Sequence, residues 1–266
     1  DLWPDFPIQM GAVPSSMVQR ALYALEQRLY RSAAHVVALS PDMARHVRRR
    51  AGHDRVTLNP YGTDLSLLRD APLQEAKARC PLEDGQHLIL YAGSFGRANA
   101  IPTLLDAAHR LRHRSDIVWA FVGDGYHHDT VAKAAQQLPN VRLLPPQPYP
   151  HTLALFKHAS LSITSFINRP VLRTNAPSKL MDSLAAGTPV IVTNPGWTQR
   201  LVTSGRCGWY VPPEDGAALA SCVASALGAD AERQASWQRN ARHLAHTHFD
   251  RERHMNRYQM LLESLV

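Results

Sequence analysis

The sequence has few cysteines and no long apolar run. Its three cysteines, Cys80, Cys207 and Cys222, are widely spaced, and this odd number argues against both a disulfide framework and a zinc site. No apolar run approaches the roughly 18 residues needed to cross a bilayer, and no signal peptide opens the chain. We therefore expect a cytoplasmic location, with any membrane contact peripheral and on the inner face of the cytoplasmic membrane.

Acidic residues are fewer than basic ones. Lysine plus arginine number 29 against 22 for aspartate plus glutamate, which gives a net charge of +7, while the hydrophobic content of 45% is that of an ordinary globular protein. A basic surface suits nucleotide phosphates, nucleic acid or an anionic membrane leaflet, although solvated charge on outer helix faces gives the same count. Because no aromatic and basic motif accompanies the charge, we expect no nucleic-acid partner.

Short apolar segments alternate with helix-length amphipathic segments from about residue 35 onward. This alternation is typical of an α/β fold with a doubly wound parallel sheet. Residues 41–51 predict a helix that Ser40 caps and Gly52 ends, and the tail from residue 231 predicts two helices that break near 246–250. The expected strands are residues 35–39, 55–61, 87–93, 117–123, 141–144, 160–166, 189–193 and 208–212.

A passage with Pro, Asp and Gly over residues 62–86 separates two expected strands from six. Six strands suffice for a complete Rossmann-like domain, whereas two form no stable sheet alone. Residues 1–14 hold three prolines and a glycine and predict a loop that leaves an absent strand. We therefore expect a truncated chain whose first domain is completed by a missing N-terminal portion or by a partner chain. The expected parts are a remnant N-terminal domain over 1–70, a complete domain over 71–248 and a returning C-terminal helix over 249–266.

Two strand exits with glycines are candidate phosphate sites, because ligands of a parallel sheet bind beyond the carboxyl ends of its strands. Gly93 and Gly96 precede a helix expected from about residue 101. Gly123 either lets backbone approach a ligand or simply makes a turn, with Asp124 capping the next helix. Neither exit matches the dinucleotide fingerprint or the GKS/GKT phosphate loop, which argues against a nicotinamide oxidoreductase.

The stretch TNAPSKLMDSLAAGTPVIVT, residues 174–193, places polar side chains at the mouth of a short helix. Asp182 would point along the exposed mouth, where its carboxylate can accept hydrogen bonds from a vicinal diol such as a ribose, or merely complement the helix dipole. Lys179 adds a positive charge beside free N–H groups that can receive phosphate oxygens. A helix from Pro177 or Ser178 that stops at Gly187 would bury one face by its 3.6-residue period, namely Leu180, Met181, Leu184 and Ala185.

These residues resemble a known family. KLMDSLAAGTPVIVT is similar to the nucleotide-sugar signature of retaining glycosyltransferases with the two-domain GT-B fold, especially glycosyltransferase family 4. The segments DLWPDFP, RVTLNPYGTD, VGDGY and RLLPPQPYPHTLALFKHASLSITSF resemble the family in the same order, so the likeness covers nearly all of the chain. It is strongest to the branch that extends lipid-linked bacterial surface polysaccharides such as O-antigen and colanic-type glycans.

The resemblance implies roles for residues at the motif positions of the family. Two glutamates of the family, separated by seven residues, correspond here to Thr174 and Asp182. Asp182 should therefore bind the ribose, whereas the donor-sugar contact of the first acid is in doubt. The loop from Asn175 through Ser178 to Lys179 would wrap the sugar and the diphosphate.

At the phosphate loop, this sequence differs from the usual pattern of the family. Ser94 and Asn99 occupy the places where the family often has an arginine and a lysine. Both usual cations are therefore missing, and Arg97, Arg173 or Lys179 would supply the charge instead, together with backbone amides at the two helix starts.

The implied reaction transfers a sugar from a nucleoside diphosphate, with UDP favoured, to a glycan or polyprenyl-linked acceptor in bacterial surface glycan synthesis, such as O-antigen or lipopolysaccharide. The enzyme would be a hexosyl- or N-acetylhexosaminyltransferase that retains the anomeric configuration, and Leu144 and Pro146 fall where the family holds the base. Because no Asp-x-Asp accompanies the phosphate mouth, we expect no cofactor and no metal requirement. Catalytic residues stay unassigned, since most of the first domain would precede Asp1. We therefore expect the isolated chain not to transfer sugar at an ordinary enzymatic rate.

Two other functions fit the same residues. A nucleotide-sugar 2-epimerase shares the architecture and the donor, but it should need acidic and histidine residues that face the hexose from both domains. A non-catalytic nucleotide-sugar-binding subunit would bind the donor without turnover.

Overall fold

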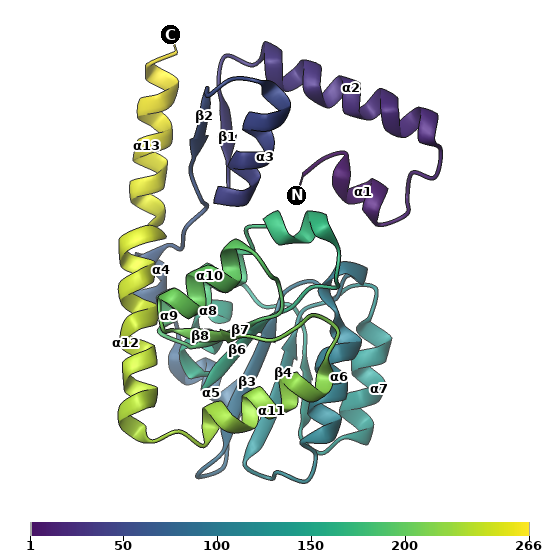
Figure 1. Ribbon diagram of the computed structural model, residues 1–266. Coiled ribbons are helices and arrows are strands. Elements are labelled where there is room, and N and C mark those ends of the chain that lie inside the picture. Colours follow the sequence, from purple (N-terminus) through teal and green to yellow (C-terminus); the bar gives the residue numbers. More distant parts are fainter. Residues whose placement is uncertain (1, 266) are drawn as a thin grey trace.

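The computed structural model describes residues 2–265 as an α/β protein with two parallel sheets (Figure 1). The strands are β1 (Val36–Ala38), β2 (Val56–Leu58), β3 (His87–Ala92), β4 (Ile117–Val122), β5 (Val141–Leu144), β6 (Leu161–Thr164), β7 (Val190–Val192) and β8 (Gly208–Tyr210). Each lies where the sequence predicts a strand, because β-branched and apolar residues fill most of these runs. The predicted α/β fold with a doubly wound parallel sheet is confirmed.

None of the described helices combines the length and the apolar composition that a bilayer crossing requires.

Helices connect the strands of both sheets. Two 3-10 turns, η1 (Arg97–Asn99) and η2 (Pro170–Thr174), lie near the ends of β3 and β6. The α-helices are α1 (Asp5–Gln9), α2 (Ser16–Ser32), α3 (Pro41–Ala51), α4 (Leu65–Arg69), α5 (Leu73–Arg79), α6 (Ile101–Arg110), α7 (His128–Gln137), α8 (Tyr149–His158), α9 (Ser178–Ala186), α10 (Trp197–Ser204), α11 (Gly216–Leu227), α12 (Ala231–His248) and α13 (Arg251–Glu263).

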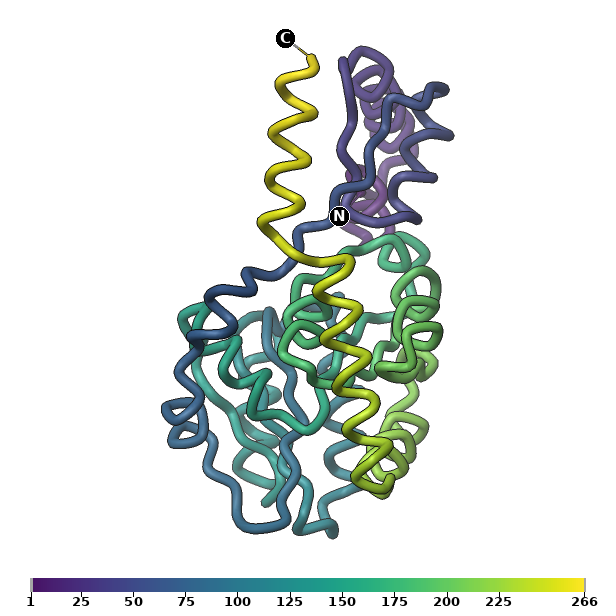
Figure 2. The backbone as a smooth tube through the Cα atoms, turned by 90° about the vertical axis from the view of Figure 1, so that its left-hand side faces the viewer, coloured from purple at the N-terminus to yellow at the C-terminus, as the bar shows by residue number. Residues whose placement is uncertain are grey.

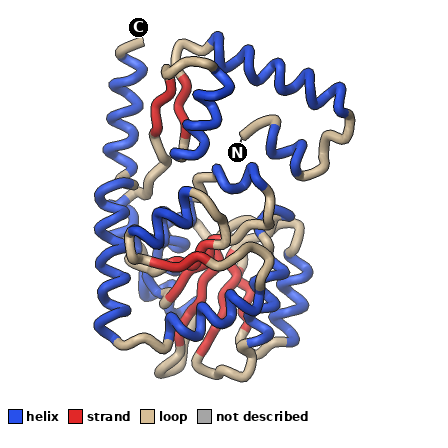
Figure 3. Tube along the Cα trace, in the orientation of Figure 1, coloured by secondary structure: helices blue, strands red, loops and turns tan. Residues whose placement is uncertain are grey.

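The larger sheet has six parallel strands in the order β5-β4-β3-β6-β7-β8. Its strands are drawn in red among the blue helices that surround them in Figure 3. From β3 the chain builds outward through β4 and β5, then returns to the other side of β3 and continues through β6, β7 and β8. The order therefore reverses between β3 and β6. In sheets of this kind, the crevice beyond the carboxyl ends of the strands at such a reversal is where ligands bind.

Helices cover both faces of this sheet, because its strands direct alternate side chains to two separate cores. On β3, Leu88 and Leu90 face a core that includes side chains of α5, α8, α9 and α12. Ile89 and Tyr91 face the opposite core, which includes side chains of α6 and α11. The two-residue period of a strand produces this division. Both faces are closed, and the rim of the sheet at the strand ends is left for a ligand.

The smaller sheet pairs β1 with β2 and packs against α3. The Ser40 hydroxyl accepts a hydrogen bond from the Met43 N–H at 3.0 Å, and the helix ends at Gly52 with a φ of +72°. Both ends match the sequence prediction, since a serine satisfies a free N–H group and a glycine adopts the left-handed conformation without strain.

The last two helices connect the two sheets. α12 lies against the larger sheet, and α13 runs beside β1 and β2 (Figures 1 and 2). The helices break at Phe249 and Asp250, as the sequence predicts. The Asn59 side chain, just after β2, donates a hydrogen bond from Nδ2 to the backbone oxygen of His254 at 3.1 Å. The expected boundary between residues 70 and 71 falls between α4 and α5.

The first residues form a short helix rather than only the loop that the sequence predicts. α1 covers Asp5–Gln9, and the Ile8 N–H donates to the Pro4 oxygen at 3.2 Å. Prolines predict a loop here, but Pro4 directly precedes the helix and Pro7 lies in its first turn. Because the first N–H groups of a helix have no partner within it, these prolines interrupt no hydrogen bond.

Candidate functional site

A cavity of about 790 Å³ opens at the carboxyl edge of the larger sheet, below the smaller one. Phe6, Met43 and Tyr61 line it from the N-terminal part of the chain. Of the residues predicted from the sequence, five do not line this cavity, namely Gly96, Arg97, Leu144, Arg173 and Thr174. The others line it together: Gly93, Ser94, Gly123, Asp124, Pro146, Asn175, Ser178, Lys179 and Asp182.

Two glycines let the exits of β3 and β4 lie in contact at the cavity floor. The Gly93 N–H donates to the Val122 oxygen at 2.9 Å, and a Cβ at Gly123 would lie 2.0 Å from the Gly93 oxygen. Gly123 also has a φ of +146°, which residues with side chains rarely adopt. Asp124 does not cap the next helix, because α7 begins only at His128. Its Oδ1 accepts from the Gly125 N–H at 2.7 Å instead.

Asp182 is buried rather than directed along an exposed mouth, which corrects the sequence prediction. Its side chain lies on α9, and the residue is only 5% exposed. The hydroxyls of Thr63 and Tyr149 donate to its Oδ1 at 2.7 Å and 2.8 Å. Burial raises the pKa of the carboxyl, and these two hydrogen bonds partly oppose that shift. Both donors use the same oxygen, so Oδ2 has no hydrogen bond within residues 2–265.

Lys179, on the first turn of α9, directs its amine toward β3. Its Nζ donates to the Tyr91 hydroxyl at 2.8 Å and lies 4.0 Å from the centre of that ring. A side chain at Gly93 would collide with the amine, since a Cβ there would lie 2.8 Å from Nζ. Burial lowers the pKa of Lys179 to about 7, because a charged ammonium loses water in this position.

The start of α9 presents backbone donors to the same space. Pro177 precedes the helix, and no side chain caps its first turn. The Leu180 N–H donates to the Pro177 oxygen at 3.1 Å, so the N–H groups of Ser178 and Lys179 are the ones available to an anion, and the helix dipole favours negative charge there. The helix ends at Gly187 with a φ of +79°, as predicted. Its buried face is also as predicted and contains Leu180, Met181, Leu184 and Ala185.

The side chains of Thr174 and its neighbour Asn175 line different cavities. The Thr174 hydroxyl donates to the Val171 oxygen at 2.7 Å, and the residue lines a different cavity. Asn175 lines the main cavity and is 6% exposed. Its Oδ1 is buried without a hydrogen-bond partner in the described part of the chain. Because a buried polar atom normally has a partner, this oxygen is an unsatisfied acceptor beside the cavity.

Of the three cations considered from the sequence, Lys179 is the one that lines the cavity. The Arg97 guanidinium stacks on Tyr126, 4.1 Å from the centre of the ring. Arg173 lines the separate cavity of about 580 Å³ that Thr174 also lines. The predicted alternatives Arg97 and Arg173 therefore do not supply charge to this site in the structure.

Three polar side chains of the site are not selected from the sequence, although two of them lie in segments that resemble the family. Thr63 lies 119 residues from Asp182, and Tyr149 lies 33 residues away on the first turn of α8. Tyr91 lies in an expected apolar strand, so the sequence predicts only a buried core residue there. Only the fold brings these hydroxyls to the charged groups of α9.

Two protein families match segments of the chain that include most of the cavity-lining residues. The family described as glycosyl transferases group 1 matches residues 74–244, and a glycosyl transferase 4-like domain matches residues 3–62. The chain belongs to the group 1 glycosyltransferases. This group 1 glycosyltransferase spans about half the length of the curated relatives it matches.

Relatives and solved structures agree with the family. A glycosyl transferase of Escherichia coli K12, WcaI, named for colanic acid biosynthesis, is 30% identical over 163 residues, which are 59% of this chain and 40% of the relative. The fold resembles a Rickettsia africae glycosyltransferase with a TM-score of 0.75, 18% identity and coverage of 90% and 66% of the two chains. Anabaena Alr3699/HepE in complex with UDP and glucose gives a TM-score of 0.72 at 19% identity, over 92% and 66%. These structures share the GT-B fold.

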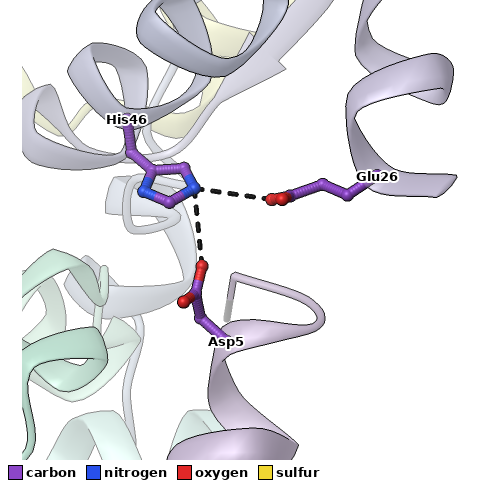
Figure 4. Close-up of side chains that lie close together, drawn as sticks. All are labelled: Asp5, Glu26 and His46. Atoms are coloured by element: carbon purple, nitrogen blue, oxygen red, sulfur yellow. Dashed lines mark hydrogen bonds and ion pairs between the residues drawn. The ribbon is translucent and has the colours of Figure 1, made fainter. Parts of the chain in front are cut away.

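The group 1 glycosyltransferase also has a cluster of potential metal ligands outside the cavity, formed by Asp5, Glu26 and His46 (Figure 4). The His46 Nε2 lies 3.5 Å from the Asp5 Oδ2 and 3.4 Å from the Glu26 Oε1. The Arg50 Nε lies 3.5 Å from the other Glu26 oxygen. Because a guanidinium already neutralises one carboxylate, we interpret the cluster as an ion network that ties α1, α2 and α3 together.

Proposed function

We propose that the cavity binds a nucleoside diphosphate sugar and that the chain forms the donor side of a retaining glycosyltransferase. The observation that carries the proposal is the combination on α9 of an amine, free backbone donors and a buried carboxylate around one cavity. Lys179 and the N–H groups of the first turn suit a diphosphate, and Asp182 suits the attached ribose. One short helix thus offers partners for both halves of a nucleotide.

The remaining groups of the cavity suit the rest of the donor. Asp182 has Oδ2 free, so a ribose hydroxyl can donate to it while Thr63 and Tyr149 hold Oδ1 in place. Asn175, which follows the position of the missing family acid, offers its unpaired Oδ1 to a hydroxyl of the sugar. Pro146 also lines the cavity, and we propose that it lies against the base, as the family resemblance implies.

The proposed chemistry depends on stabilising the leaving diphosphate. As the bond between the anomeric carbon and the phosphate oxygen breaks, negative charge grows on the phosphate oxygens. Preorganised donors at the α9 start and the Lys179 ammonium can stabilise that charge. These groups can act without a metal, and we propose that none is required. The groups that activate the acceptor are not assigned to any residue of this chain.

The proposed acceptor is a glycan or polyprenyl-linked glycan of a bacterial surface polysaccharide such as O-antigen or lipopolysaccharide. The colanic acid assignment in the name of the E. coli relative supports this class. A second cavity, of about 570 Å³, shares Tyr149, Ser178 and Asp182 with the first and adds Arg251 and Met255, so a second substrate has room beside the donor. We further propose a cytoplasmic location with peripheral membrane contact.

We also propose that this chain acts together with further N-terminal-domain structure. Two short strands form the smaller sheet, fewer than an independent sheet needs. The expected partner is therefore a polypeptide segment that extends this sheet, on the same chain or another one.

Isothermal titration calorimetry against a panel of UDP, GDP, ADP, dTDP and their sugars tests the proposal. We expect one nucleotide, with UDP favoured, to bind at a single site, and we expect Asp182→Ala to weaken it at least about tenfold, since a hydrogen bond to a charged group contributes about 1.5–3 kcal/mol. Absence of binding for the whole panel would contradict the proposal. Product analysis with donor alone then separates transfer from epimerisation, which would convert the sugar without an acceptor.

A further inference from the structure

The amine of Lys179 lies in a three-part hydrogen-bonded chain at the edge of the cavity. Its Nζ donates to the Tyr91 hydroxyl at 2.8 Å, and that hydroxyl donates to the backbone oxygen of Ser94 at 2.7 Å. Tyr91 is only 1% exposed and is fixed on β3 between Phe95 and Phe121. The chain of hydrogen bonds therefore attaches the α9 amine to the loop that follows β3.

Among residues 2–265, the amine has no anionic partner in this position. Asp182, on the same helix, accepts from Thr63 and Tyr149, and Asp124, beyond β4, is exposed and accepts from Gly125. Within residues 2–265, no carboxylate forms an ion pair with Lys179. The groups that face the amine are thus the Tyr91 ring and hydroxyl on β3 and the backbone around Gly93.

This arrangement holds an amine at a position where its charge is costly until an anion arrives. Burial lowers the pKa of Lys179 to about 7, so part of the Lys179 side chains are uncharged at neutral pH. A diphosphate beside Nζ would favour the ammonium, because an opposite charge within about 4–6 Å favours the charged form. Nζ has three donors once protonated, so it can keep Tyr91 and still donate to phosphate oxygens.

We propose that Tyr91 is a positioning residue that holds Lys179 at the phosphate loop, and that Lys179 takes up a proton when a nucleoside diphosphate binds. The inference rests on the proposed function and adds a coupling between donor binding and protonation. The Nζ lone pair forms a new N–H bond with a proton from solvent. No bond of the nucleotide changes, and the side chain gains one positive charge.

Calorimetry in buffers of different ionisation enthalpy measures this proton directly. We expect UDP binding at pH 8 to take up a large part of one proton per site, because most of an amine with a pKa near 7 is uncharged at that pH. At this pH the terminal phosphate is fully ionised, since its second pKa is about 6. Lys179→Met should abolish the uptake and weaken UDP about tenfold or more. Uridine, which has no diphosphate, should bind without proton uptake.

Tyr91→Phe separates positioning from a structural role. The variant keeps the ring and removes the hydroxyl that accepts from the amine. We expect UDP affinity to fall about tenfold. We also expect the midpoint of the proton-uptake curve to move to lower pH, because the ammonium loses a hydrogen bond. A purely structural role would leave this midpoint unchanged. Tyr210→Phe, on β8 and outside the cavity lining, is the matched control and should keep both the affinity and the midpoint.

A second measurement observes the amine itself. The chain has only four lysines, so ¹³C-dimethylation and NMR give few signals, and Lys179→Arg identifies the one of interest. We expect that signal to titrate near pH 7 and to shift to higher pH with UDP. UDP binding without proton uptake and with an ordinary lysine titration would refute the inference and leave the proposed function intact. Failure of all nucleotides to bind would refute both. The lysines are Lys77, Lys133, Lys157 and Lys179.

Discussion

Replacing Asp182 by asparagine separates the role of its charge in binding from the cost of that charge to the fold. Asparagine has nearly the same shape, and its Oδ1 can still accept from Thr63 and Tyr149. What changes is the group at the Oδ2 position, where a charged acceptor becomes an NH₂ donor. A hydrogen bond to a charged group contributes about 1.5–3 kcal/mol, so UDP should bind roughly 10- to 150-fold more weakly.

The same substitution should stabilise the unliganded protein at neutral pH. Because burial raises the pKa of Asp182 in the folded state, the folded protein holds this proton to a higher pH than the unfolded chain does. The protonated Asp182 carboxyl contributes favourably to the free energy of folding. This contribution is complete below the unfolded-state pKa of about 3.9, and it is lost as pH rises through the folded-state pKa. Asp182→Asn removes this loss of stability, because asparagine carries no charge at any pH. Its melting temperature should exceed that of the wild type at pH 7.

Asp116→Asn is the matched control for both measurements. Asp116 pairs with Arg114 at 2.6 Å and does not line the cavity, and its hydrogen bond with Arg114 lowers the pKa of Asp116. Its substitution should leave UDP affinity unchanged and lower the melting temperature slightly, since the pair is partly exposed. The reasoning fails if Asp182→Asn binds UDP as tightly as the wild type in calorimetry, or if its melting temperature falls below that of Asp116→Asn.

Three further predictions follow from the site. Asn175→Ala should weaken a UDP-sugar several-fold while leaving UDP unchanged, and equal loss for both ligands in calorimetry would exclude a sugar contact. Tyr149→Phe removes one of two hydrogen bonds to Asp182, worth about 0.5–1.5 kcal/mol, so UDP affinity should fall roughly 2- to 12-fold; unchanged affinity would argue against this support. Gly123→Ala should prevent soluble expression, since its Cβ would meet backbone at 2.0 Å, whereas Gly85→Ala has open space and should cost only about 1 kcal/mol by thermal denaturation; comparable stability of the two would contradict the steric argument.

Local signals explain what could be predicted from the sequence. The strands and the ends of α3 and α9 depend on β-branched runs, a serine cap and two glycines, all of which lie within a few residues of the structure they determine. The position of Asn175, Ser178 and Lys179 at the cavity follows from the same local pattern, because the start of α9 meets the carboxyl edge of the sheet.

Tertiary contacts decide the features that were missed. Asp182 is buried, and Thr63, from the linker after β2, donates a hydrogen bond to it that no spacing in the sequence predicts. Nothing in the sequence distinguishes Arg97 and Arg173, which face elsewhere, from Lys179, whose direction depends on Tyr91 in the neighbouring strand. The charge of a residue can be read from the sequence, but the direction of its side chain requires the fold.

A crystal structure of the chain with UDP tests the central claim most directly. We predict that the diphosphate lies against the start of α9 and the Lys179 amine, with a ribose hydroxyl within hydrogen-bond distance of Asp182. UDP bound at another place, with this cavity empty, would contradict the account.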